Sequence, residues 1–483
     1  MVIGAGFSGI AMGIRLLGAG IENFVILERS DDLGGTWRDN TYPGCACDIP
    51  SHLYSYSFRP NPRWSRMFSP QPEIWAYLRE CVEAYGLAPH LRYGTEVVSA
   101  TYHDRAARWT VETAAGDSVL AEIVVAGVGA LNEPHYPELP GLSSFRGATF
   151  HSARWDHGHD LRGERVAVIG TGASAVQFVP RIAADAAQLD VYQRSAPWVI
   201  PRPDRPIGGR EQRWHARLPL TQRVLRSAIF WALELRGAGF TVDPRLMRRI
   251  ETQARRHLHR QVDDAELRAR LTPDYQIGCK RVLVSDDYYP ALTRPDVTLV
   301  SDRIREVTPT GVVTADGTVR PADTLVFGTG FRVSASLTRM RIRGRDGVEL
   351  TERWRRVGVG AHLGITVPGF PNLFLLSGPN TGLGHNSLVF MIEQQVGYVV
   401  RALAAMRSRG ADWMAVRERP QRRFVDRVQT RLSDSVWSRC RSWYLDESGR
   451  NFAIWPYSTG QYWLETRRLR ARDFEFGVRQ RER

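Results

Sequence analysis

The chain has 483 residues, which is more than one ordinary domain, and its 43% hydrophobic and 24% charged residues are typical of a globular protein. The net charge of +14 comes from arginines spread along the whole chain, not from a basic block with interleaved aromatic residues, so we do not expect nucleic-acid binding. No apolar run approaches the roughly 18 residues that cross a bilayer, and Met1 leads directly into an apolar strand without a signal peptide. We therefore expect a cytoplasmic protein without stable membrane insertion.

The first motif in the chain is VIGAGFSGI at residues 2–10, with Gly4, Gly6 and Gly9 at the G-x-G-x-x-G spacing between a short apolar strand and an apolar helix. Glycines there allow a tight turn and a close approach of the backbone to a pyrophosphate at the positive end of the helix. The next strand, FVIL, ends before Glu28, an acid placed to accept hydrogen bonds from ribose hydroxyls. This order predicts a dinucleotide site. Only three residues precede Gly4, so we expect the natural chain to begin upstream of Met1.

The second motif, VAVIGTGASA at residues 166–175, repeats the arrangement in the G-x-G-x-x-A form and is again followed by a helix and a strand, LDVY. Glu28 lies 24 residues after Gly4, and the residue 24 after Gly170 is Arg194, which is followed by Ser195. A guanidinium suits a 2′-phosphate, which a carboxylate would repel. We therefore expect the first site to bind FAD and the second to bind NADPH rather than NADH. The residues of the second turn are Gly170, Thr171, Gly172, Ala173, Ser174 and Ala175.

Both units end in a similar way, with a hairpin around a glycine-containing turn and then an apolar strand that ends in small residues. The fold class expected is α/β, with two Rossmann-like dinucleotide-binding domains and a helical insertion at about 205–275. The expected boundaries are 1–140 and 331–483 for the two parts of the FAD-binding domain, and 141–330 for the NADP-binding domain. Ile229, Phe230 and Trp231 of the insertion form either a buried packing face or part of a substrate cavity.

Between the two units, FRGATFHSARWD carries Phe145, Gly147, His151, Trp155 and Asp156. An earlier stretch carries a second gapped motif. Its residues are Gly35, Trp37, Tyr42, Pro43, Gly44 and Asp48. These two motifs resemble the fingerprints of the type I Baeyer–Villiger monooxygenases, within the flavin-containing monooxygenase superfamily, and the resemblance extends from residue 1 to about residue 465.

The resemblance implies roles for individual residues. Arg281 of GCKRV is the expected catalytic residue, because a guanidinium stabilises negative charge on a peroxide oxygen, and Asp48 is expected to position it; a turn-capping Asp48 is the simpler alternative. His151 is expected to orient the linker between the domains, with proton transfer as its alternative role. Trp443 is expected to cap the nicotinamide nucleotide.

Lys280 stands out without any resemblance, because it is the only lysine among the 65 basic residues. A compact ammonium suits a phosphate, and the family match also assigns Lys280 to the NADPH 2′-phosphate. The expected FAD contacts outside the first glycine turn and Glu28 come from three further stretches. They are Gly35, Thr36, Trp37, Asp48, Tyr54 and Ser387, and Gly378 and Asn380 are further candidates in the loop NLFLLSGPNTGLGHNS, for which a plain Gly/Asn loop is the alternative.

The implied reaction uses NADPH, FAD and O₂ to convert a ketone to an ester or lactone through a C4a-peroxyflavin. Oxygenation of a soft nitrogen or sulfur atom by the related flavin-containing monooxygenases is the alternative, and a non-catalytic flavoprotein would not need Arg281 or Lys280. Pyridine nucleotide–disulfide reductases share the double nucleotide fold, but the spacing of Cys45 and Cys47 is not theirs.

Cysteine spacing gives no other signal. The five cysteines are scattered and match neither a disulfide framework nor a zinc motif, so we expect no structural disulfide and no metal site. They are Cys45, Cys47, Cys81, Cys279 and Cys440.

Overall fold

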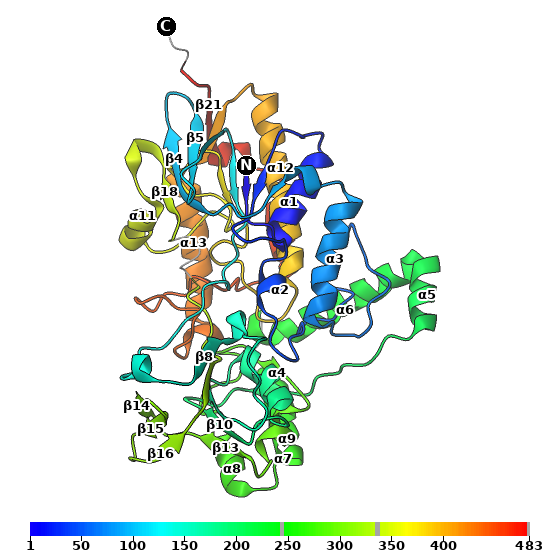
Figure 1. Cartoon of the computed structure of the whole chain (residues 1–483). Coiled ribbons are helices and arrows are strands. Elements are labelled where there is room, and N and C mark those ends of the chain that lie inside the picture. The colour runs from blue at the N-terminus through cyan, green and yellow to red at the C-terminus, as the bar shows by residue number, and fades with distance from the viewer. Residues whose placement is uncertain (242–245, 334–338, 481–483) are drawn as a thin grey trace.

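Two parallel five-stranded sheets organise the chain (Figure 1). The computed structural model describes residues 1–241, 246–333 and 339–480. The first sheet has the order β19 (Leu373–Leu375), β7 (Val124–Ala126), β1 (Val2–Ile3), β2 (Ile26–Leu27), β3 (Leu91–Arg92). The second has the order β13 (Val297–Val300), β10 (Gln188–Tyr192), β9 (Arg165–Ile169), β17 (Thr324–Phe327), β8 (Ala148–His151). All neighbouring strands in both sheets are parallel, which confirms the expected pair of Rossmann-like domains.

Each sheet begins with the predicted strand, glycine turn and helix. Helix α1 (Phe7–Leu17) follows β1, and α4 (Ala173–Ile182) follows β9. The predicted hairpins are also present. They are β4 (Val97–His103), β5 (Arg108–Thr113) and β6 (Ser118–Ala121) in one unit, with β18 (Arg341–Arg343) at the edge, and β14 (Ile304–Thr308), β15 (Gly311–Thr314) and β16 (Val319–Pro321) in the other.

The helix α12 (Leu388–Ser408) is long and apolar enough, by length and composition alone, to cross a membrane. Half of its apolar window is buried in the fold, where it packs against α1 and α14 (Thr459–Thr466). Its apolar residues are therefore accounted for by the core. The other helices on this side of the molecule are α2 (Thr36–Asp39), α3 (Gln71–Ala84), α11 (Leu350–Val357) and α13 (Glu418–Ser433).

The helical insertion contains α5 (Gly209–Arg217), α6 (Pro219–Thr241), α7 (Met247–Gln261) and α8 (Ala265–Arg270). Helix α6 contacts the half of the molecule that contains the first sheet. Arg226 Nη1 donates to the carbonyl of His52 at 2.9 Å, and the rings of Phe230 and Phe390 lie 5.1 Å apart. Helix α7 contacts the other half, since His257 Nε2 lies 2.8 Å from the carbonyl oxygen of Ser285.

The structure differs from the sequence expectation at one residue of α6, namely Trp231. Ile229 and Phe230 pack against the core, as the packing interpretation predicts, but Trp231 is 62% exposed. Trp231 therefore lines neither the core nor an enclosed cavity.

Candidate active site

The two glycine turns have the same geometry. Gly4 has φ +97° and Gly170 has φ +108°, a region that favours glycine. A Cβ at these positions would lie 2.7 Å from the carbonyl oxygen of Gly127 and 2.5 Å from that of Gly328. In each unit the turn passes close to the backbone at the end of β7 or β17. The first residue of the turn therefore has to be glycine.

Packing does not explain the middle glycine of each turn. A Cβ on Gly6 would come no closer than 3.7 Å to its nearest neighbour, Gly35 Cα, and a Cβ on Gly172 would lie 3.7 Å from Gly328 O. Neither α1 nor α4 has a side-chain cap or an acidic residue in its first turn. Bare backbone at the positive end of a helix fits a pyrophosphate, so both turns fit a dinucleotide.

Glu28 lies where the first turn meets the end of β2. Its side chain is almost fully buried, Oε2 accepts from the backbone N–H of Ala5 at 2.8 Å, and Oε1 accepts from Ser30 N at 3.1 Å. Arg38 Nη1 also lies 3.2 Å from Oε1. The carboxylate is thus fixed beside the glycine turn, as a ribose-binding acid requires.

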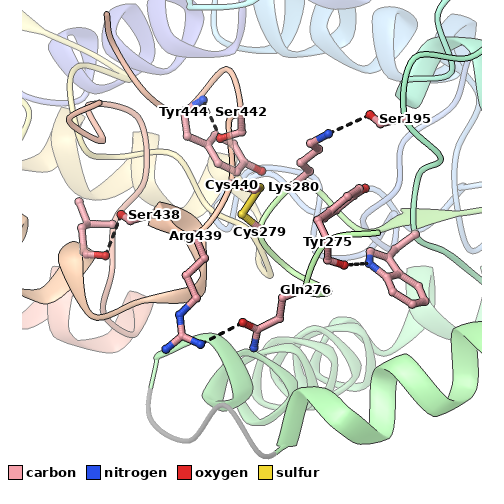
Figure 2. Close-up of a disulfide and its surroundings, with 12 residues drawn as sticks. Ser195, Tyr275, Gln276, Cys279, Lys280, Ser438, Arg439, Cys440, Ser442 and Tyr444 are labelled. Carbon is pink, nitrogen blue, oxygen red and sulfur yellow. Dashed lines mark hydrogen bonds between the residues drawn. A yellow bond between two sulfur atoms is a disulfide. The ribbon is translucent and has the colours of Figure 1, made fainter. Parts of the chain in front are cut away.

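The equivalent place in the second unit is cationic. Lys280 Nζ donates to Ser195 Oγ at 2.9 Å and lies 4.4 Å from the centre of the Tyr275 ring (Figure 2). Thr171 Oγ1 donates to the carbonyl of Ser195 at 3.3 Å, which joins this group to the glycine turn. Burial and then the neighbouring Arg194 lower the pKa of Lys280 from its usual value.

Among the described residues, neither Arg194 nor Lys280 forms an ion pair with a carboxylate, and Asp274 only partly offsets the effects that lower the pKa of Lys280. The two cations repel each other, as the effect of Arg194 on the pKa of Lys280 shows, and a bound anion would relieve this repulsion. The donor set therefore fits a 2′-phosphate.

Arg281 and Asp48 join the two halves of the molecule. Nε and Nη2 of Arg281 both donate to Oδ2 of Asp48, at 2.9 and 2.6 Å, and Nη1 lies 3.5 Å from the carbonyl oxygen of Leu383. Asp48 is the main reason that the pKa of Arg281 is raised above its already high value. Both side chains stay about one-third exposed, at 32% and 28%. Asp48 thus fixes a permanently charged guanidinium that keeps about one-third of its surface exposed.

The remaining FAD-side candidates differ in what they do. Trp37 Nε1 donates to the Tyr54 hydroxyl at 3.1 Å, next to Gly35 and Thr36 at the start of α2. Ser387 is fully buried, and its hydroxyl has no hydrogen-bond partner among the described residues, which fits an absent ligand.

Gly378 and Asn380 are explained by packing. A Cβ on Gly378 would lie 2.2 Å from the carbonyl oxygen of Gly364, and the amide of Asn380 donates to the carbonyls of Asn451 and Ile454 at 2.9 and 3.1 Å. These contacts fasten the loop to the C-terminal segment.

The linker fingerprint is a packed connection. His151 is fully buried, its Nδ1 accepts from Ala153 N at 3.1 Å, and burial lowers its pKa to about 4. Trp155 packs edge-on against Phe150, with ring centres 5.0 Å apart, and contacts Phe178 of α4. A Cβ on Gly147 would lie 2.0 Å from the carbonyl oxygen of Asp323, whereas Phe145 is partly buried and Asp156 Oδ1 accepts from Gly158 N.

The expectation of no structural disulfide is wrong. Cys279 and Cys440 are bonded, across a sequence separation of 161 residues (Figure 2). The bond ties the segment that carries Lys280 and Arg281 to the segment that carries Trp443. Trp443 itself is 46% exposed, and its ring lies 4.4 Å from that of Tyr444. Spacing gave no warning, because only folding brings these two cysteines together. Cys45, Cys47 and Cys81 are buried free thiols.

The sequence analysis missed Glu234 of α6. Its carboxylate accepts from Thr459 Oγ1 at 2.6 Å and Asn386 Nδ2 at 2.7 Å, and His385 Nε2 lies 3.1 Å away. This single acid joins the insertion, the loop before α12 and the start of α14. An acid within a helical stretch carries no signal of such long-range contacts.

One cluster has the residue types of a metal site, namely His52, Glu211 and His215, with ligand atoms within 4.8 Å of one another. The amide nitrogen of Gln222 donates to the Asn61 carbonyl at 2.6 Å, which fixes the amide so that it also donates to His52 Nδ1 at 3.1 Å. Since Nδ1 accepts, the proton of neutral His52 lies on Nε2, which then has no lone pair for a metal. The cluster therefore does not fit a metal ion.

Comparisons with known proteins agree with this geometry. The family model described as flavin-binding monooxygenase-like matches residues 1–339, and the chain therefore belongs to that family. A relative from Pseudomonas aeruginosa called Baeyer-Villiger monooxygenase is 48% identical over 473 residues, covering 97% of this chain and 90% of the relative.

Two solved structures are similar over almost their whole length. An oxidized steroid monooxygenase bound to NADP is 31% identical, with a TM-score of 0.88, and the match covers 99% of this chain and 98% of that one. OTEMO in complex with FAD and NADP is 28% identical, with a TM-score of 0.89 and the same coverage.

Proposed function

We propose that the protein is a Baeyer–Villiger monooxygenase that uses FAD, NADPH and O₂ to convert a ketone to an ester or lactone. The balance is ketone, O₂, NADPH and H⁺ to ester, H₂O and NADP⁺. The relatives' activities and the bound cofactors of the solved neighbours support this proposal. The observation that carries it within the chain is the Arg281–Asp48 ion pair, in a molecule that also has one glycine turn that fits FAD and another that fits NADPH. FAD, once reduced by NADPH, supplies the activation of O₂.

Arg281 is proposed as the catalytic residue. Oxygen transfer to a carbonyl concentrates negative charge on oxygen, and a guanidinium held in place lowers the energy of that charge without reorganising. Asp48 occupies Nε and Nη2, whereas Nη1 has only a long 3.5 Å contact to Leu383 O and would be the nitrogen available to the reacting oxygen. Asp48 is thus a positioning residue in this proposal.

Arg194, Ser195 and Lys280 are proposed to hold the 2′-phosphate of NADPH, and Glu28 the ribose of FAD. Gly4, Gly6 and Gly9 in one unit, and residues 170–175 in the other, would bind the two pyrophosphates. Trp443 is proposed to cover the nicotinamide nucleotide. His151 is proposed to hold the linker as a neutral, buried side chain rather than to transfer protons. The cytoplasmic location expected from the sequence stays a prediction.

The test is a product analysis with the purified, FAD-loaded protein, NADPH and ¹⁸O₂, against cyclic, linear and aryl ketones and a set of sulfides. We expect esters or lactones that carry one ¹⁸O atom per molecule. Sulfoxides without any ester would instead make the protein a heteroatom oxygenase. NADPH oxidation that yields only hydrogen peroxide with every substrate would refute oxygenation altogether.

A further inference from the structure

Helix α6 has an exposed apolar face that the proposed reaction does not explain. Leu220, Val224, Trp231 and Leu235 recur on one side of the helix and are 70%, 61%, 62% and 73% exposed. Ser227, Ala228 and Ala232 are exposed on the same side. We call this set the outer face. Trp214 of α5 and Leu218 of the following turn, 57% and 48% exposed, extend the apolar surface beyond it. A contiguous exposed apolar surface of this kind marks a site of interaction.

The charges around the outer face have a single sign. Every exposed charged residue from 209 to 240 is an arginine. These residues are Arg210, Arg213, Arg217, Arg223 and Arg236. The two acids of the stretch are partly buried and occupied, because Glu211 pairs with Arg205 and Glu234 accepts from Thr459 and Asn386. The apolar face is therefore bordered by unopposed positive charge.

Charge decides between the possible partners. A second copy that docked by this same face would bring five arginines against five arginines, which opposes association. An anionic lipid surface complements the arginines, and tryptophan and leucine side chains enter the boundary between headgroups and acyl chains. Figure 1 shows α5 standing out at the edge of the molecule, with α6 running from there back towards the centre.

We propose that α5 and the outer face of α6 form a peripheral docking site for an anionic membrane surface. The helix lies on the bilayer and does not span it. At 23 residues, α6 is about 34 Å long, so the outer face offers an extended contact.

The inner side of α6 connects this surface to the proposed oxygenation site. Glu234 holds His385 and Asn386, and two residues before His385 the carbonyl oxygen of Leu383 lies 3.5 Å from Arg281 Nη1. Docking would thus place the proposed site beside the bilayer, which suits a lipophilic ketone that partitions into it. This choice of substrate class rests on the proposed function, whereas the docking itself does not.

The experiment uses the full-length, FAD-loaded protein without an affinity tag and sedimentation with phosphatidylcholine vesicles, with and without phosphatidylglycerol. We expect binding to the anionic vesicles and its loss at high salt. The pair Trp231→Ser and Leu235→Ser should weaken binding by at least about tenfold, because the apolar contact is lost. Arg213→Gln and Arg217→Gln should each weaken it by about fivefold.

Matched controls separate the outer face from general surface effects. Leu120→Ser and Val319→Ser remove side chains of similar exposure, 65% and 62%, from β6 and β16, and should leave vesicle binding unchanged. Circular dichroism checks that each variant is folded. Equal binding by both pairs of variants, or no binding by the unchanged protein, would overturn the proposal. A dimer that the Trp231→Ser and Leu235→Ser pair dissociates would also overturn it and identify a second copy as the partner.

Turnover distinguishes a failure of docking from a failure of the proposed function. The Trp231→Ser and Leu235→Ser pair should retain activity on a water-soluble ketone and lose rate only on a ketone supplied within anionic vesicles. Vesicle binding without oxygenation of any ketone would preserve the docking site and refute the enzyme assignment.

Discussion

Lys280 gives the sharpest test of the cofactor site, because the substitution Lys280→Met should change the choice between NADPH and NADH. The ammonium lies 2.9 Å from Ser195 Oγ in a half-buried position, where burial and then Arg194 lower its pKa more than Asp274 raises it. A charge-assisted hydrogen bond to a phosphate in such a place contributes about 2 kcal/mol, or about thirtyfold in affinity. NADH has no 2′-phosphate, so its binding should not change.

The assay compares kcat/KM for NADPH and NADH with one ketone at saturation. For Lys280→Met we expect the NADPH value, and with it the ratio, to fall about thirtyfold. The pH dependence follows from the lowered pKa of Lys280. A bound phosphate raises the pKa of Lys280 again. Above the lowered pKa, Lys280 of the free enzyme is deprotonated, so the enzyme must take up a proton when it binds NADPH. Affinity for NADPH should therefore weaken at alkaline pH, and Lys280→Arg should remove this dependence.

Arg294→Gln is the matched control, because Arg294 is an exposed cation at the amino end of β13, on the edge of the sheet opposite the turn. It should leave the NADPH/NADH ratio unchanged. If Lys280→Met and Lys280→Arg both keep the affinity, the ratio and the pH profile of the unchanged protein, the phosphate role of Lys280 is refuted.

Three further perturbations address the catalytic residue, the disulfide and the buried histidine. Arg281→Ala should lower ester formation by about 10²–10³-fold, with NADPH oxidation diverted to hydrogen peroxide, and equal ester yield per NADPH would contradict its catalytic role. Cys440→Ser should lower the free energy of unfolding by up to about 5 kcal/mol, because the bond to Cys279 closes a loop of 161 residues; urea unfolding measures this, and an unchanged midpoint would exclude a structural role. His151 has a folded pKa of about 4 against 6.5 when unfolded, so its contribution to stability is present above pH 6.5 and falls by up to about 3 kcal/mol towards pH 4. His151→Gln should flatten this acid dependence in urea titrations, and a profile as steep as that of the unchanged protein would count against it.

The parts of the molecule that depend on local backbone chemistry could be predicted from the sequence. The turns at Gly4 and Gly170 need a positive φ and a missing side chain, and only glycine meets both requirements. The opposite charges of Glu28 and Arg194 could also be predicted, because each residue follows the second strand of its unit at the same distance from the first glycine. The fold class followed from these two repeated units and is confirmed.

The features that depend on contacts between distant segments could not be predicted. The bond between Cys279 and Cys440 and the network of Glu234 join residues separated by more than 150 positions, and no spacing rule covers such pairs. The exposure of Trp231 was also hidden, because α6 carries apolar residues on both sides and its sequence does not say which side is covered. The resemblance supplied the roles of Arg281 and Asp48; the structure shows their ion pair, and the roles themselves stay a prediction.

The contacts of the insertion have a mechanical consequence. In sequence, α5 and α6 interrupt the NADP half of the chain, but the contacts of Gln222, Arg226 and Glu234 fasten α6 to segments around the FAD sheet. Helix α7, by contrast, is joined to Ser285 beside the NADP sheet. If the NADP sheet pivots during the reaction, α7 travels with it while α6 stays with the flavin, so the dividing line between the moving parts runs through the insertion itself.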